Sequence, residues 1–129
     1  MGTVLIMFEI CVNLHIHTRF SDGSGTHREI ALAAIRSGLD AVLVTDHNVY
    51  VQEAEGYYED GGKRVLLLVG EEIHNPMRHP QKSHLLAFGA CRELAYLSTD
   101  LRKLIDTIHM HAGAAFAAHP SDSESEIVH

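Results

Sequence analysis

The chain has 129 residues, of which 46% are hydrophobic and 21% are charged, and its formal net charge is −7. This length suits one small domain, and the hydrophobic share excludes a chain that is disordered throughout. The acidic balance argues against a basic face that grips a nucleic-acid backbone. Histidine is strongly over-represented, with 11 residues spread along the chain.

The cysteines and the apolar runs indicate a compartment. Cys11 and Cys91 are too few for a disulfide framework, and Cys11, in an apolar stretch, is expected to be a buried small hydrophobe. The N-terminal run has no basic segment before it and is interrupted by Glu9, and no apolar run reaches about 18 residues. We therefore expect a cytoplasmic protein with neither a signal peptide nor a membrane span.

The first predicted elements are a strand, a helix and a second strand. Residues 4–16 are almost continuously apolar, which is typical of a strand buried on both faces. Residues 26–38 are predicted to form a helix, because Thr26 and Glu29 make a capping-box pattern ahead of an apolar stripe. Residues 40–46 form the second buried strand. Together these elements predict a βαβ unit.

The remainder of the chain is predicted to alternate in the same way. The expected elements are a surface helix over 49–60, a strand over 65–69, a loop over 74–83, a strand over 84–88, a helix over 99–112 and a strand over 114–119. The core face of the last helix is expected to consist of Leu101, Leu104, Ile105 and Ile108. This order predicts an α/β fold of mostly parallel strands, whose functional sites lie at the C-terminal strand ends.

Two histidines end the first predicted strand. His15 and His17 are two residues apart, so an extended backbone points both imidazoles to one face. Asp22 follows in a turn rich in serine and glycine. Two imidazoles and a carboxylate at a strand end are the beginning of a metal site. An isolated H-x-H pair, in contrast, is better explained by chance.

The other predicted strand ends carry the same residue types. They are Asp46, His47, Glu71, Glu72, His84 and His119. Burying so many imidazoles and carboxylates without partners would cost free energy, so we infer convergence on bound cations. With no cysteine among them, Zn, Mn, Fe or Co is expected. Because one ion takes roughly four to six ligands, we predict two or three divalent ions joined by a bridging carboxylate.

Five short motifs span these positions. They are L-H-I-H-T with S-D-G within 14–23, V-T-D-H-N at 44–48, G-E-E-I at 70–73, H-L-L-A-F-G at 84–89 and A-A-H-P at 117–120. In this order they resemble the motifs of the polymerase-and-histidinol-phosphatase (PHP) superfamily of metal-dependent phosphoesterases. Each motif is weak by itself, whereas five in the family's order are highly specific.

The resemblance implies a distorted (β/α)7-type barrel that holds up to three ions. The ligands that it implies are His15 and His17 for the first ion, Glu72 as the bridge from the first to the second, His84 and His119 for the second, and Asp22 and His47 for the third. Asp46 is expected to orient a ligand histidine. Glu71 should point away from the bridge, as the next residue on a strand does.

The chain departs from the family's pattern at two places. Asn13 stands where the family usually has aspartate, and we expect it beside the ligands rather than among them. The family's late D-x-H motif is not found, and Ser121–Asp122 is no substitute. We therefore expect residues 1–129 to be the N-terminal portion of a PHP domain with an incomplete barrel. The site of Glu72, His84 and His119 would then be the best completed.

The function that the resemblance implies is hydrolysis of a phosphate ester in a small metabolite or nucleotide. A metal-bridged hydroxide would attack phosphorus, with Glu72, His15 and His17 acting through the ions. Arg19 and Arg78 could contact the phosphate, although a surface salt bridge is the better explanation for each.

Several histidines lie outside this set. His74 and His79, in the loop over 74–83, either touch substrate or are merely solvated. The others, expected on the surface or on a helix face, are His27, His109, His111 and His129.

Two other functions fit the same residues. A metal site of this kind could hydrolyse carbamates or carboxylic esters, because an activated water attacks carbonyl carbon as well as phosphorus. Alternatively, the chain could be an inactive binding or structural module, as some PHP-type modules inside DNA polymerases are. The number of retained ligand positions argues against the inactive module.

Overall fold

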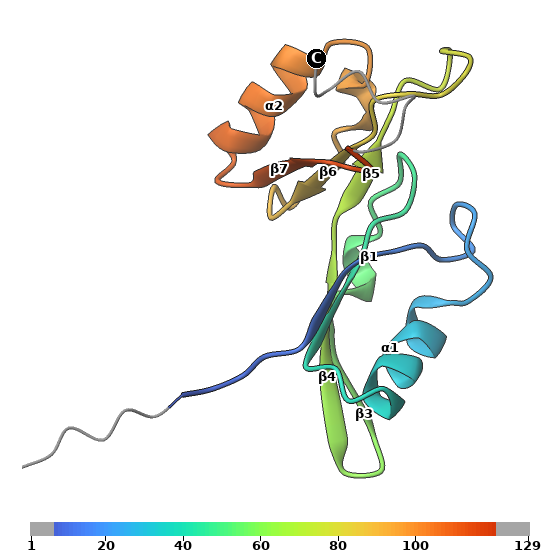
Figure 1. The fold of residues 1–129 in the computed structure, drawn as a ribbon, viewed down its shortest axis with the longest axis vertical. Helices are drawn as coiled ribbons and strands as arrows, with labels where there is room; N and C mark the ends of the chain where they lie inside the picture. Colours follow the sequence, from blue (N-terminus) through green and yellow to red (C-terminus); the bar gives the residue numbers. More distant parts are fainter. Residues whose placement is uncertain (1–6, 121–129) are drawn as a thin grey trace, which may run out of the picture.

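The computed structural model describes residues 7–120, which form two sheets, each accompanied by one α-helix (Figure 1). The first sheet has the strand order β1-β2-β4-β3 and the second β5-β6-β7. The strands are β1 (Val12–Ile16), β2 (Ala41–Val44), β3 (Gly56–Asp60), β4 (Lys63–Val69), β5 (Glu71–Ile73), β6 (Leu85–Phe88) and β7 (Ala114–Ala117). The helices are α1 (His27–Arg36) and α2 (Leu101–Met110), with short 3-10 turns at Gln52–Ala54 and Ala95–Leu97.

The predicted βαβ unit is present. Thr26 caps α1: its hydroxyl accepts from the Glu29 amide at 3.2 Å, and the Glu29 carboxylate accepts from the Thr26 amide at 2.7 Å. The apolar stripe of α1 packs on the first sheet around Val44 and Leu67, both fully buried. Each such aliphatic side chain contributes about 1.5–3 kcal/mol when it leaves water. On either side of α1 in the sequence, β1 and β2 pair in parallel, so their C-terminal ends lie side by side.

The helix predicted over 49–60 is wrong. That segment contains the 3-10 turn Gln52–Ala54 and then β3, which pairs antiparallel with β4. Gly61 and Gly62 both adopt positive φ, which allows the tight hairpin turn between β3 and β4. Adjacent tyrosines also favour a strand, and Tyr58 packs against the core under α1.

The α/β class is confirmed, but the expectation of mostly parallel strands is wrong for the part of the chain described. Parallel ladders are confined to β1–β2 and β2–β4, while β5, β6 and β7 pair antiparallel. No helix lies between β5 and β6, and the loop over 74–83 simply returns the chain. Residues 7–120 thus form a mixed α/β fold with two α-helices and no closed barrel.

The two sheets are joined where β4 passes into β5. Gly70 stands at this joint, and a Cβ there would lie 2.6 Å from the Ala87 carbonyl oxygen, so only glycine lets the strands approach. Glu72 donates its amide to the Asp46 carbonyl at 3.1 Å and forms a parallel bridge with His47. The ends of β1 and β2 are thereby brought against β5.

Several burial predictions need correction. Cys11 is exposed because it precedes β1 at the sheet's margin, and Leu101 is exposed because it opens α2 at the solvent side. Leu104 and Ile108 of α2 are buried, as expected, in the hydrophobic core that α2 shares with β5 and β6. His27, expected on the surface or on a helix face, is the first residue of α1 and is buried against Phe20. Within residues 7–120, neither helix has the length and apolarity to cross a bilayer.

Candidate metal centre

Glu72 stands at the centre of a ring of histidines. Its side chain is 0% exposed, and it enters from β5 beneath the joint of the two sheets. The imidazole nitrogens nearest its Oε2 are those of His17 (3.0 Å), His15 (3.3 Å) and His47 (3.5 Å). Those nearest its Oε1 belong to His84 (2.9 Å) and His119 (3.4 Å). The structure therefore gathers on one carboxylate five histidines from four separate stretches of the sequence.

The unsatisfied atoms of this cluster fit a divalent cation. Glu72 Oε2 and His47 Nδ1 are buried and have no hydrogen-bond partner, although three imidazole nitrogens lie within 3.5 Å of that oxygen. A buried carboxylate oxygen left without donors is costly. Potential ligand atoms lie within 4.8 Å of one another in the groups His15–Glu72–His119 and His17–His47–Glu72. Imidazole and carboxylate donors in this mixture could hold Zn, Mn or Fe.

Asp22 joins the cluster from the loop after β1. Its Oδ2 is 3.4 Å from His47 Nε2, and its Oδ1 is 3.5 Å from His17 Nδ1. Its side chain is 65% exposed, in contrast to the fully enclosed Glu72. All seven residues predicted as ligands therefore lie in one cluster, with the Asp22–His47 pair at its open side.

The pKa shifts of His15 and Asp22 favour the protonation states that bind metal ions. Burial lowers the pKa of His15, and the neighbouring histidines lower it further against the opposing effect of Glu72. Burial, the largest single effect, raises the pKa of the Asp22 carboxyl, but His17, His47 and hydrogen bonds from the backbone and Ser21 together outweigh it, so the net shift is downward. A neutral imidazole and an ionised carboxylate are the forms that bind metal ions.

Two residues that do not enter the cluster hold His15 in place. Thr45 Oγ1 is 2.9 Å from His15 Nδ1, and Asn13 Oδ1 accepts from the His15 amide at 3.0 Å. Thr45 is fully buried and directly follows β2, whose end lies beside β1. Sequence reasoning missed Thr45, whose signal was its place in V-T-D-H beside the strand that carries H-x-H. Asn13 lies beside the ligands, as expected.

Asp46 acts on a loop rather than on a histidine. Its carboxylate accepts from the Thr18 amide (2.7 Å), the Thr18 hydroxyl (2.6 Å) and the Ser21 hydroxyl (2.7 Å). It reaches His17 only through Ser21, whose Oγ is 3.5 Å from His17 Nδ1. The predicted effect of Asp46 on a ligand histidine would therefore pass through Ser21, because the loop over 18–23 folds between Asp46 and His17. That loop carries Asp22.

Glu71 points away from the cluster, as strand alternation requires. Its Oε2 accepts from the amide of Leu94 at 2.8 Å, and Leu94 belongs to the hydrophobic core that α2 shares with β5 and β6. Burial raises the pKa of Glu71 to about 7, and Glu93 adds to the shift against the lowering effect of the backbone amides.

The remaining candidates differ in exposure. His79 and Arg19 are exposed, and the described contacts tie Arg19 electrostatically to Glu29 rather than to the histidines. His74 is buried, which corrects the expectation of a solvated loop residue. Arg78 lines a separate cavity of about 220 Å³ beside Asn75.

A second, larger cavity opens beside the metal cluster. It measures about 530 Å³ and reaches His17 and Asp22 at one end and the first turns of α1 at the other. This volume is in the range of small-molecule sites. It touches the cluster only on the Asp22 side.

In a comparison with known protein families, residues 13–127 match the model of the PHP domain. The DNA polymerase/3'-5' exonuclease PolX of Bacillus subtilis (strain 168) is 41% identical over 44 residues, which are 34% of this chain and 8% of that protein. The chain thus matches less than a tenth of that relative's length.

Proposed function

The chain belongs to the PHP domain family, and from this premise we propose that it is a metal-dependent phosphoesterase for a small phosphorylated metabolite or a nucleotide. The observation that carries the proposal is Glu72, a fully buried carboxylate with imidazole nitrogens 2.9–3.5 Å from its two oxygens. A carboxylate with separate nitrogen donors beside each oxygen suits a bridge between two ions.

The chain's own residues would divide the binding work. The proposed ligands are His15 and His17 beside Glu72 Oε2, His84 and His119 beside Oε1, and His47 with Asp22 at the open side. Divalent ions at such sites activate water and neutralise phosphoryl oxygens. Thr45 keeps His15 in orientation, and Asp46 keeps the loop of Asp22 closed on the cluster.

Charge and space support a small substrate. The chain's net charge of −7 disfavours long nucleic acid, and the cavity of about 530 Å³ beside His17 and Asp22 has room for a small ester. Arg19, exposed on the loop that carries Asp22, remains a proposed phosphate contact.

A phosphatase screen with the full chain tests this proposal. Turnover of phosphomonoesters should require an added divalent metal, disappear with a chelator and fall steeply in Glu72→Ala. Glu71→Gln is the matched control, since Glu71 is equally buried but faces Leu94. Turnover that survives both chelation and Glu72→Ala would overturn the proposal, and activity confined to aryl esters or carbamates would replace it with carbonyl hydrolysis.

A second candidate is removal of nucleotides from a 3' end. It is favoured by the similarity to a protein named as a 3'-5' exonuclease, over 44 residues. Short single-stranded oligonucleotides labelled at the 5' end would distinguish the two, because stepwise shortening occurs only if the phosphodiester is the substrate.

A further inference from the structure

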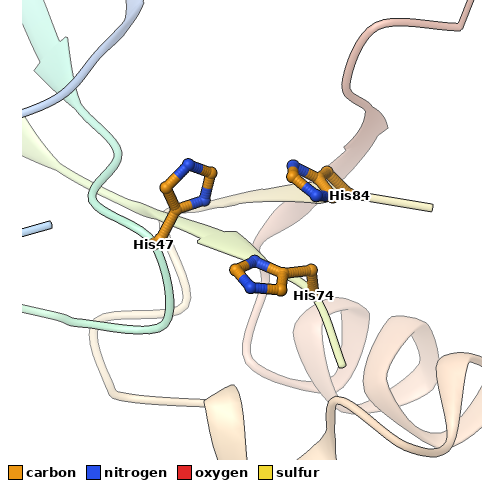
Figure 2. A group of neighbouring side chains, drawn as sticks. All are labelled: His47, His74 and His84. Atoms are coloured by element: carbon orange, nitrogen blue, oxygen red, sulfur yellow. The ribbon is translucent and has the colours of Figure 1, made fainter. Parts of the chain in front are cut away.

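We propose that His74 is a further metal ligand and that His47, His74 and His84 form an all-imidazole site for a Zn²⁺-class ion (Figure 2). Each ring offers one nitrogen, and these three atoms all lie within 4.8 Å of one another. The proposal deepens the metal centre described above and rests on it. His74 belongs to none of the motifs that predicted the other ligands, so its role comes from its position in the fold.

The fold fixes His74 against His47 by a clamp on its backbone. Asn48 Oδ1 accepts from the His74 amide at 3.0 Å, and Asn48 Nδ2 donates to the His74 carbonyl at 3.0 Å. Asn48 also donates its own amide to the Glu72 carbonyl at 3.1 Å. Asn48 adopts a φ of 53°, a left-handed conformation that asparagine tolerates better than most residues. Asn48, the residue after His47, is thus hydrogen-bonded to Glu72 and to His74, the two neighbours of Ile73.

The ring of His74 is enclosed and lacks a partner. Its residue is 7% exposed, and its Nδ1 is buried without a hydrogen bond. The ring stacks on His84 with centroids 4.7 Å apart and meets His47 edge-on at 5.0 Å. Leaving a buried polar nitrogen without a partner is unfavourable. Figure 2 shows the three rings gathered around a common space, where a cation would satisfy this nitrogen.

The donor set selects the kind of ion. Three neutral nitrogens with no carboxylate suit Zn²⁺, Ni²⁺ or Cu²⁺ far better than Mg²⁺ or Ca²⁺, and better than Mn²⁺. A neutral imidazole has one free lone pair, so His47 and His84 serve either this triad or the groups around Glu72, not both. His74 therefore biases these shared rings toward zinc, while Glu72 favours metals that accept oxygen ligands.

Metal titrations of the full chain test this site. Zn²⁺ and Mn²⁺ are titrated separately into wild type, His74→Phe and His79→Phe, with a chromophoric chelator as competitor. Phenylalanine keeps the ring and its stacking on His84 but removes the nitrogens. We expect His74→Phe to weaken Zn²⁺ binding at least about tenfold, the lower end of effects seen close to a metal, and to leave Mn²⁺ affinity within about twofold. The exposed His79 is the matched control from the same loop and should change neither.

Two results would overturn the site. Unchanged Zn²⁺ affinity in His74→Phe refutes the ligand role and leaves the phosphoesterase proposal standing, whereas equal weakening of both metals indicates packing alone. A wild type that binds neither metal refutes the whole centre. Unfolding with a chelator present checks that the variant is folded, and His74→Gln takes the same test, with the same expected loss, if phenylalanine is not tolerated.

Discussion

The two faces of β5 carry adjacent glutamates that are alike in type and burial and opposite in surroundings. Glu71 and Glu72 are 1% and 0% exposed. On one face, Glu71 lies in the apolar core with the Leu94 amide as donor, and burial raises its pKa to about 7. On the other face, Glu72 has five histidines around it. Each glutamate has one buried oxygen without a hydrogen bond, Oε1 in Glu71 and Oε2 in Glu72, so the histidines are what distinguishes the two.

The contrast teaches that burial of a carboxylate does not by itself mark a metal site. A proton can neutralise Glu71, because among residues 7–120 only backbone amides oppose the effect of burial on its pKa. Glu72 is instead surrounded by nitrogen ligands that bind a cation when they are neutral. The partners on each face of the strand, rather than the sequence G-E-E-I, decide which glutamate has a functional role.

The largest expected effect separates the two faces by metal affinity. Glu72→Gln should lower divalent metal affinity by more than about a hundredfold, because it removes the shared anionic ligand, and changes beside a metal already cost about 10–100-fold. Glu71→Gln should leave affinity within about twofold. Competition titration with Mn²⁺ measures both. Equal losses in the two variants would remove the distinction between the faces.

The second effect is on stability and depends on pH. The pKa of Glu71 is about 7 in the folded chain against 4.5 in the unfolded one, so the folded state holds the proton more tightly. Stability should therefore fall as pH rises from about 4.5 to 7, at up to about 1.4 kcal/mol per unit, and stay level above it.

Urea unfolding of wild type and Glu71→Gln across this range isolates the Glu71 contribution. The difference between the two proteins cancels the titration of the histidines, and it should turn in favour of Glu71→Gln toward pH 7. A constant difference would show that Glu71 ionises normally.

The smallest expected effect is on metal affinity, when the contact that orients His15 beside Glu72 is removed. Thr45→Val keeps the shape of the buried side chain but removes the oxygen 2.9 Å from His15 Nδ1. Loss of this orienting contact should weaken metal binding by about tenfold. Thr107→Val is the control because Thr107 is a half-buried residue of α2, away from the cluster, and its hydroxyl donates to the Lys103 carbonyl. An unchanged affinity in Thr45→Val would mean that packing alone orients His15.

The parts of the fold that follow from local rules could be predicted from the sequence. Thr26 and Glu29 fixed the start of α1, and strand alternation brought His15 and His17 to one face. The segment over 49–60 was misjudged because its charged residues suggested a surface helix, while the Gly61–Gly62 turn and the pairing with β4 made it a strand. Pairing between strands is a tertiary effect that local patterns do not contain.

The candidate site divides in the same manner. Its seven predicted ligands stand in recognisable motifs, and the structure gathers them. Thr45 and His74 could not be assigned, because their roles depend on which segment lies beside them: β1 for Thr45, and Asn48 for His74. The contacts of Asp46 with Thr18 and Ser21 could not be predicted, since the fold of the loop over 18–23 cannot be read from its sequence.

The most direct test of the account is the position of bound ions relative to Glu72. Crystals grown with Mn²⁺ and measured at the metal's absorption edge locate the ions by anomalous scattering. The account predicts separate ions on the two Glu72 oxygens, each at about 2.0–2.2 Å, the distance usual for carboxylate ligands. Both oxygens on a single ion, or no ion in contact with Glu72, would contradict it.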